Sequence, residues 1–297
     1  MKVAYLILTH KNPQLLKRII QALSSDDCGF FIHVDKKSDI AKFSDIRGGN
    51  VFFTGKRIPV YWGEFSGVRA TLLLLRQALD SPENYDYFVF LSGSDYPLRS
   101  RKYIHAYLEA NRGIEFMTLV KVPAPGKPLS RINTIRFESD KPVRRLVSRG
   151  LAKLGLAQRD YRKYLGNLEA CSGRALWALT QDACRYLLEF LAQNPHVERF
   201  FENTFAPDEA FFHTILGNSK FGQRVRGNLV YEDWSARGAH PAMIDVRHVA
   251  LFKSREKVFD GGTLDGPVES LLARKFSDEN LDLLDAIDEM IAEKEGH

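Results

Sequence analysis

The sequence has 297 residues, of which 44% are hydrophobic and 27% are charged. This composition is typical of a soluble globular protein and excludes a chain that is mainly disordered. The net charge of +5 suits an anionic ligand or surface, but it is too small to indicate a nucleic-acid-binding protein. The length allows either two small domains or one large α/β domain.

The cysteines and the apolar runs indicate the compartment. Cys28, Cys171 and Cys184 show no C-x-x-C spacing, so they predict neither a disulfide framework nor a thiolate zinc site. The N-terminus has no signal-peptide cleavage pattern, and no apolar run reaches the roughly 18 to 20 residues that cross a bilayer. We therefore expect a cytoplasmic protein without a transmembrane anchor.

Strands and helices alternate in the first third of the chain. Apolar runs predict strands at residues 2–9, 30–34, 51–54 and 87–91. Helical spacing of apolar residues predicts helices at 13–23, after an Asn-Pro start signal, and at 65–79, with Ser66 as the N-cap. This alternation indicates a parallel sheet covered by helices on both faces.

Polar residues follow three of these strands: Thr9 and His10, Asp35, and Ser94 with Asp95. Open parallel sheets bind ligands at the carboxyl ends of their strands, so these residues predict a binding site. Neither G-x-G-x-x-G nor G-x-x-x-x-G-K-[ST] occurs, which argues against a dinucleotide-dependent oxidoreductase and a P-loop NTPase. Any bound phosphate must therefore be held by side chains.

Residues 140–164 form a basic amphipathic stretch. It has eight Lys or Arg against two Asp, with apolar residues interleaved at roughly helical spacing. Two interpretations stay open: a solvated surface helix with a packed apolar face, or a segment that contacts an anionic membrane or an anionic acceptor.

The second half of the chain continues the mixed pattern. It predicts strands at 176–179, 228–231 and 246–252, and helices at 181–191, 208–216 and 277–293. A glycine turn is expected at residues 261–262. The last helix has acidic residues in its first turn, where they favour the helix dipole.

Two adjacent carboxylates stand out at the start of the predicted helix 208–216. Asp208 is suited to capping that helix. Glu209 has phenylalanines around it in the sequence, and an apolar setting would raise its pKa toward the range of a general base. Local spacing alone favours the structural interpretation for both.

Cations and aromatic residues form further candidate groups. Residues 253–257 and 273–276 are rich in Lys and Arg, which can neutralise a leaving diphosphate, although a solvated surface run is the alternative. Trp62 and Trp234 stand near acidic residues, as sugar-stacking aromatics do, although each alone is more often a core residue. The eight histidines show no metal-ligand spacing, and Asp95 lacks the second Asp of a D-x-D pair.

Taken together, these segments resemble glycosyltransferase family 14, the core-2/I-branching β-1,6-N-acetylglucosaminyltransferases and peptide O-xylosyltransferases, and especially its short bacterial members. The matching stretches occur in the family's order over nearly the whole chain: AYLILTHKNPQLLKRII, FIHVDKKS, VYWGEFSGVRATLLLL, YFVFLSGSDYPLRS, GRALWALT, PDEAFFHTIL, YEDWS with HP, and LLARKF. The resemblance implies an α/β, Rossmann-like A-type glycosyltransferase fold with a mostly parallel central sheet. It favours one domain over residues 1–297, with 140–164 as an insertion and 277–297 as a C-terminal helix.

The resemblance implies an inverting transfer of a sugar, GlcNAc favoured, from a UDP-sugar to a hydroxyl of a glycan or lipid-linked saccharide. Glu209 matches the family's catalytic base. Thr9, His10 and Asp35 resemble the strand ends with which the family binds the nucleotide. We add Asp95 to this predicted nucleotide site. The family uses basic side chains in place of a metal, so no cofactor is expected. The candidate residues for the diphosphate are Lys275 and Arg255. The candidate residues for the acceptor or the sugar are Trp234, Trp62, Trp177 and Asp208.

The chain also departs from the family. Gly173-Arg174-Ala175-Leu176 replaces a Gly-Ser-Gln-Trp of many relatives, so acceptor identity does not transfer. The stem, anchor and extra cysteines of secretory members are missing, which suggests the cytosolic side of a bacterial-type cell, with peripheral contact to the inner face of an anionic membrane. UDP-xylose or UDP-glucose as donor, and a non-catalytic nucleotide- or saccharide-binding relative, are the alternatives.

Overall fold

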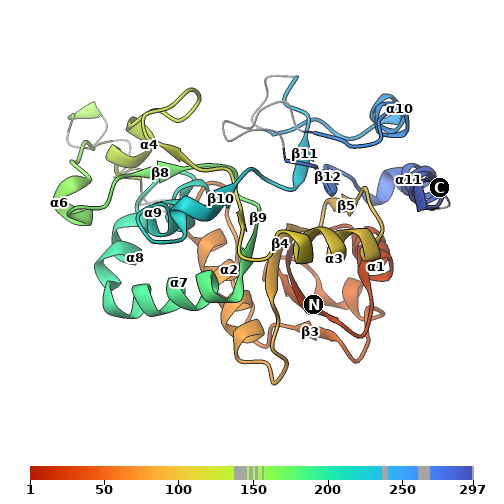
Figure 1. Ribbon diagram of the computed structural model, residues 1–297. Helices are drawn as coiled ribbons and strands as arrows, with labels where there is room; N and C mark the ends of the chain where they lie inside the picture. Colours follow the sequence, from red (N-terminus) through yellow and green to blue (C-terminus); the bar gives the residue numbers. More distant parts are fainter. Residues whose placement is uncertain are drawn as a thin grey trace.

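The computed structural model describes residues 1–136, 146, 150, 153–155, 157–235, 240–259 and 268–295. About half of the basic stretch 140–164, and the glycine turn at 261–262, lie outside these residues. The ribbon in Figure 1 shows a central sheet with helices packed around it.

The central sheet has seven strands in the order β10-β6-β9-β4-β1-β2-β3. Their bounds are Val3–Thr9 for β1, Cys28–Val34 for β2, Val51–Phe53 for β3, Tyr87–Ser92 for β4, Glu115–Phe116 for β6, Trp177–Thr180 for β9 and Val225–Arg226 for β10. Strand β1 pairs in parallel with β2 and β4, and the pairs β2–β3 and β10–β6 are also parallel. Only β9 runs antiparallel, to β4 and β6. The predicted α/β class with a mostly parallel sheet is therefore confirmed.

The first helix shows why the sequence pattern was informative. α1 spans Pro13–Leu23, and its apolar residues at helical spacing are the ones buried against the sheet. Proline fits the first position of a helix because that N–H needs no intrahelical partner. Asn12, just before it, adopts the left-handed backbone region with φ 61°. The predicted strand and helix bounds agree closely here.

Further helices surround the sheet. Helix α2 (Ser66–Leu79) packs on β1 and β2, and α7 (Gln181–Gln193) packs on β4 and β9. Ser66 is the first residue of α2 and not its predicted N-cap, because its hydroxyl instead accepts a hydrogen bond from the Tyr61 N–H at 2.9 Å. The other described helices and short elements are α3 Arg101–Ala110, α4 Ser130–Asn133, α6 Arg162–Leu165, α8 Pro195–Phe201, α9 Phe211–Gly217, η1 Ile40–Phe43, η2 Pro207–Glu209 and η3 Gly222–Arg224.

Two smaller sheets accompany the central one. The first has the order β11-β12-β5, from Val230–Glu232, Leu272–Arg274 and Asp95–Pro97. The second pairs β7 (Val120–Lys121) with β8 (Cys171–Ser172). The first of these brings the last part of the chain beside the end of β4, which matters for the site below.

The strand predicted at 246–252 is wrong. These residues belong to helix α10, Val246–Ser254. The Asp245 carboxylate accepts hydrogen bonds from the first-turn N–H groups, and the His248 Nδ1 accepts one from the Asp245 N–H, which forms a reciprocal cap. Side-chain capping of this kind favours a helix start even where β-branched residues favour a strand.

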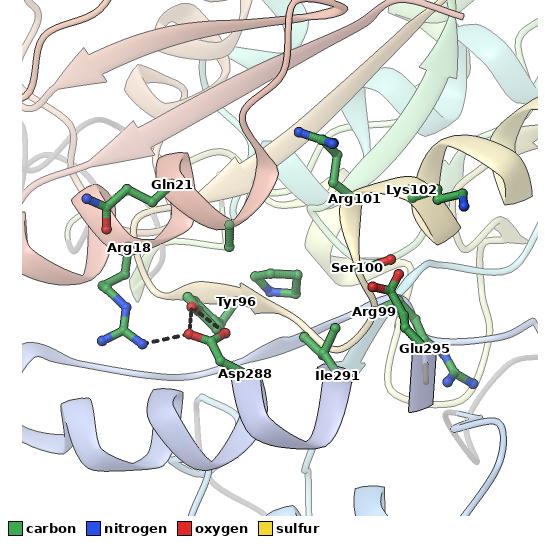
Figure 2. A pocket seen from close by; sticks show the side chains of 12 residues that line it. Arg18, Gln21, Tyr96, Arg99, Ser100, Arg101, Lys102, Asp288, Ile291 and Glu295 are labelled. Atoms are coloured by element: carbon green, nitrogen blue, oxygen red, sulfur yellow. Dashed lines mark hydrogen bonds and ion pairs between the residues drawn. The ribbon is translucent and has the colours of Figure 1, made fainter. Parts of the chain in front are cut away.

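The C-terminal helix α11 (Leu281–Glu295) follows the short turn η4 (Asp278–Asn280). Asp288 on this helix accepts hydrogen bonds from the Tyr96 hydroxyl at 2.9 Å and from Arg18 at 2.7 Å (Figure 2). These contacts fasten α11 to α1 and β5. Among the described residues, no helix combines the length and the apolar character that a membrane span requires.

Candidate active site

The carboxyl ends of β2, β1 and β4 lie side by side. The Asp35 N–H donates to the Thr9 carbonyl at 2.8 Å, and the Gly93 N–H donates to the Leu8 carbonyl at 3.0 Å. A Cβ on Gly93 would lie 2.1 Å from the Thr9 Oγ1, so only glycine allows this close approach. The structure thus brings together the strand ends that the sequence singled out. A role for Thr9 and Asp35 in nucleotide binding stays a prediction.

Asp95 does not have the open position that direct contact with a nucleotide requires. It is 0% exposed, and its carboxylate accepts hydrogen bonds from the Ser92 N–H at 2.7 Å and the Ser92 hydroxyl at 2.8 Å. Its Oδ1 also lies 3.4 Å from the Arg274 Nε. Burial raises the pKa of Asp95, against the opposing charge of Arg274. Its predicted contact with the nucleotide is therefore wrong, because its carboxylate is buried and bound by Ser92.

Lys275 is held at the same edge of the sheet. Strand β12 pairs with β5, so the residues that follow β12 pass next to the end of β4. The Phe276 N–H donates to the Ser94 carbonyl, and the Ile244 N–H donates to the Lys275 carbonyl, both at 2.8 Å. The backbone of Lys275 is therefore fixed on both sides.

We call Lys275, Arg274 and Lys11 the cation cluster, and the rings of His10 and His240 lie beside it. Burial lowers the pKa of Lys275, and the charges of Arg274 and Lys11 lower it further. Burial and Lys11 lower the pKa of His10, and burial and Lys275 lower that of His240. Like charges in proximity disfavour each other's charged forms, so these groups lie close enough to repel.

The cation cluster lacks matching anions. In the part of the chain that the structure describes, neither Lys11 nor Lys275 has an ion-pair partner, and Arg274 has only the distant contacts to Asp95 and Glu232. A ligand with two or more negative charges would relieve the repulsion. The arrangement is therefore suited to a diphosphate.

Arg255 does not join this cluster. It is exposed beyond the end of α10, and its carbonyl accepts a hydrogen bond from the Lys294 Nζ at 2.7 Å. The charged neighbours of Lys275 are instead Arg274 and Lys11. The structure therefore does not place Arg255 beside Lys275, since its exposed side chain follows the end of α10.

Glu232 is a site residue that the sequence prediction missed. It is buried, and its carboxylate lies 3.4 Å from the Arg174 Nε and 3.6 Å from the Arg274 Nη1. It also accepts a hydrogen bond from the Trp234 Nε1 at 3.0 Å. The available signal was an acidic residue directly after a predicted strand, where a buried charge needs partners.

Glu209 lies in the turn η2. Its backbone carbonyl accepts hydrogen bonds from the Gly173 N–H at 2.8 Å and the Ser172 hydroxyl at 2.7 Å. Its side-chain Oε2 is paired with the Arg131 Nη1 at 2.6 Å and with the Lys127 Nζ. The predicted apolar surroundings of Glu209 are therefore wrong, since two cations contact its carboxylate.

Asp208 is not the predicted helix cap. It lies inside η2, whose end precedes α9, and no side-chain cap bond forms there. Burial, helped by the charge of Glu209, raises the pKa of Asp208 to about 6. Its Oδ1 has no hydrogen-bond partner among the described residues. A predicted contact of Asp208 with the acceptor or sugar stays untested.

Trp62 connects Glu209 with the cation cluster. Its ring is 66% exposed and makes edge contacts with Phe205 at 5.7 Å and His240 at 5.4 Å between centroids. Phe205 lines the same small pocket as Glu209. His240 lies beside the cation cluster, close enough for Lys275 to lower its pKa. An exposed aromatic face between a carboxylate and a group of cations is suited to a sugar ring.

The other two tryptophans differ. Trp234 is 41% exposed, as an acceptor contact requires. Trp177 is 2% exposed and packs between Phe90 and Phe212 in the core, so its predicted acceptor contact is wrong. On β9 it pairs with Phe90 of β4, and the central position of that strand explains its burial.

A cavity of about 580 Å³ lies elsewhere, between α1, β5, the start of α3 and α11 (Figure 2). None of the predicted site residues lines it. Searching the described residues finds no group of three or more His, Cys, Asp or Glu arranged to hold a metal ion.

Comparisons with known proteins extend these observations. The family model "Branch: Core-2/I-Branching enzyme" matches residues 3–254. Xylosyltransferase 2 of Homo sapiens is 28% identical over 252 residues, and that of Rattus norvegicus is 27% identical over 256 residues; each alignment covers 80% of this chain and 27% of the relative. Xylosyltransferase 1 of Rattus norvegicus is 26% identical over 255 residues, covering 80% and 28%. The chain thus spans little more than a quarter of the length of these relatives.

Among solved structures, apo mouse xyloside xylosyltransferase 1 has a TM-score of 0.34 and 11% identity, covering 91% of this chain and 97% of the other. That TM-score is too low to support an argument about the fold. The family model, in contrast, runs from β1 to the end of α10 and so covers most of the chain. The chain therefore belongs to the Core-2/I-branching enzyme family, a family of glycosyltransferases.

Proposed function

We propose that this protein transfers a sugar from a UDP-sugar to a hydroxyl of a saccharide acceptor, with inversion at the anomeric carbon. The observation behind the proposal is the exposed Trp62 ring, which contacts the surroundings of Glu209 on one side and of Lys275 on the other. A sugar on that ring would have a carboxylate and a group of cations at its two ends.

In this mechanism, Glu209 accepts the proton of the acceptor hydroxyl. The oxygen then bonds to the anomeric carbon, and the bond from that carbon to the UDP oxygen breaks with its electron pair. Lys275, with Arg274 and Lys11 in place of the predicted Arg255, would stabilise the charge on the departing diphosphate. His10, Asp35 and Thr9 would contact the nucleoside.

The donor sugar and the acceptor are further proposals. GlcNAc is the first candidate sugar, and the relatives named xylosyltransferases favour xylose as the second. The proposed acceptor is a glycan or a lipid-linked saccharide on the cytoplasmic side of the membrane. The transfer is proposed to need no metal ion.

The test is a panel of UDP-GlcNAc, UDP-xylose and UDP-glucose, in which UDP release to water and to added saccharides is measured. We expect one donor to be consumed several-fold faster than the others, at a rate unchanged by EDTA. Donor binding by calorimetry without any UDP release over days would instead support a non-catalytic binding protein. Loss of activity in EDTA that manganese restores would overturn the metal-free mechanism.

A further inference from the structure

The carboxylate proposed as the base is already paired. Lys127 and Arg131, from the segment around α4, both contact the Oε2 of Glu209, and the Lys127 Nζ also donates to the Gly173 carbonyl at 2.7 Å. Within the described part of the chain, Oε1 has no hydrogen-bond partner. Both cations are therefore held by the same carboxylate oxygen, Oε2.

This pairing opposes the proposed chemistry. When Glu209 takes a proton, Lys127 and Arg131 lose the charge that compensates them in a partly buried position. Removing one partner of such a pair is costly, because the remaining charges keep their desolvation penalty. Proton transfer to Glu209 costs less free energy if another anion pairs with Lys127 and Arg131 when Glu209 becomes neutral.

Among the residues that the structure describes, Glu209 alone forms ion pairs with Lys127 and Arg131. The pocket that Lys127, Arg131 and Glu209 line has a free volume of only about 10 Å³, at the lower limit for one water molecule. The described residues supply one further carboxylate, Asp208, and one further cation, Arg136, whose guanidinium lies 4.2 Å from the centroid of the Phe205 ring. Among these described residues, three cations therefore stand against two carboxylates.

We infer that Lys127 and Arg131 bind an anionic group of the acceptor saccharide, a carboxylate or a phosphate, and thereby release Glu209 to act as the base. The inference rests on the proposed function and specifies its acceptor as anionic. Arg131 can pair with either anion through two parallel N–H bonds, and Lys127 acts as a point charge. A neutral acceptor would leave both cations on Glu209.

The test measures UDP release from a saturating UDP-sugar in the presence of glucuronate, glucose 1-phosphate or neutral glucose, at equal ionic strength. For the wild type, we expect at least fivefold faster release with one of the anionic saccharides than with glucose. A response to glucuronate alone identifies the carboxylate, and a response to glucose 1-phosphate alone identifies the phosphate. Equal release with all three saccharides overturns the inference while the proposed function stands.

Variants locate the effect. The double substitution Lys127→Gln with Arg131→Gln should raise UDP release with glucose and abolish the preference for anionic saccharides. Lys121→Gln is the matched control, because Lys121 pairs with Glu169 on the surface of the same segment, and it should keep the preference. A double variant that keeps the preference also overturns the inference. If the wild type releases no UDP under any condition, the proposed function fails and the inference fails with it.

Discussion

The two ends of the candidate site treat positive charge in opposite ways. Around Glu209, Lys127 and Arg131 are matched by a carboxylate of the protein itself. Around Lys275, burial and the charges of Arg274 and Lys11 lower the pKa of Lys275, and the described residues provide little to compensate these cations. The cations at the Lys275 end are therefore suited to a ligand with two negative charges, whereas an ion pair within the protein already compensates the cations at the Glu209 end.

The largest effect should come from removing the base. Glu209→Gln keeps an oxygen for Lys127 and Arg131 but cannot accept the acceptor proton, so we expect kcat to fall about 10³-fold while UDP binds as before. Kinetic assays and calorimetric titration with UDP measure the two quantities. Glu169→Gln, the same change in a surface ion pair, is the control. A Glu209→Gln rate within tenfold of the wild type would mean that another group is the base.

Asp208 tests whether the Glu209 end also contains an uncompensated carboxylate. Its pKa is raised from 3.8 to about 6, so the folded state binds more protons than the unfolded state between those pH values. The free energy of unfolding therefore falls as pH rises through this window, by about 3 kcal/mol in total. The variant Asp208→Asn lacks this titration. Urea unfolding should therefore show that the free energy of unfolding of the variant, relative to that of the wild type, increases from pH 4 to pH 7. A difference that does not change with pH would contradict the prediction.

Removing one cation should weaken the other end. Lys275→Gln is expected to raise the Kd for UDP by about 10- to 100-fold, since a hydrogen bond to a charged group contributes about 1.5 to 3 kcal/mol. Lys253→Gln, an exposed lysine on α10, is the control. Arg255→Gln tests the correction made above and should change the Kd less than twofold. A large effect of Arg255→Gln would restore it to the diphosphate site.

The smallest effect concerns the ring between the two ends. Trp62→Ala removes the aromatic face, and we expect KM for the donor or acceptor to rise about fivefold, from a loss of about 1 kcal/mol. Trp62→Phe should show a smaller rise in KM than Trp62→Ala, because an aromatic ring face remains. Unchanged KM values for both substrates in Trp62→Ala would separate the two ends functionally.

Much of the central sheet could be predicted from the sequence. Strands β1, β2 and β4 are continuous apolar runs because both of their faces are covered, and α1 shows one apolar face. The helix α10 was missed because its start depends on the side-chain cap of Asp245 and His248, which outweighs the β-branched residues in the pattern.

Parts of the site were harder to predict because they depend on where a residue lies in the fold and not on its local sequence. Trp177 and Trp234 are both tryptophans near motif residues, but only their positions in the sheets separate a core ring from an exposed one. Arg255 and Arg274 are both cations near Lys275 in the chain, and strand pairing alone decides which of them lies at the strand ends.

The sequence by itself determined the α/β class, the three polar strand ends and the importance of Glu209 and Lys275 as candidates, because these depend on local patterns and on motif resemblance. Only the tertiary structure decided how charge is distributed among them. Lys127 and Arg131 are some eighty residues from Glu209, and Glu232 is forty-two residues from Arg274. Ion pairs over such separations arise from the packing of strands and loops, so no local pattern in the chain could have indicated them.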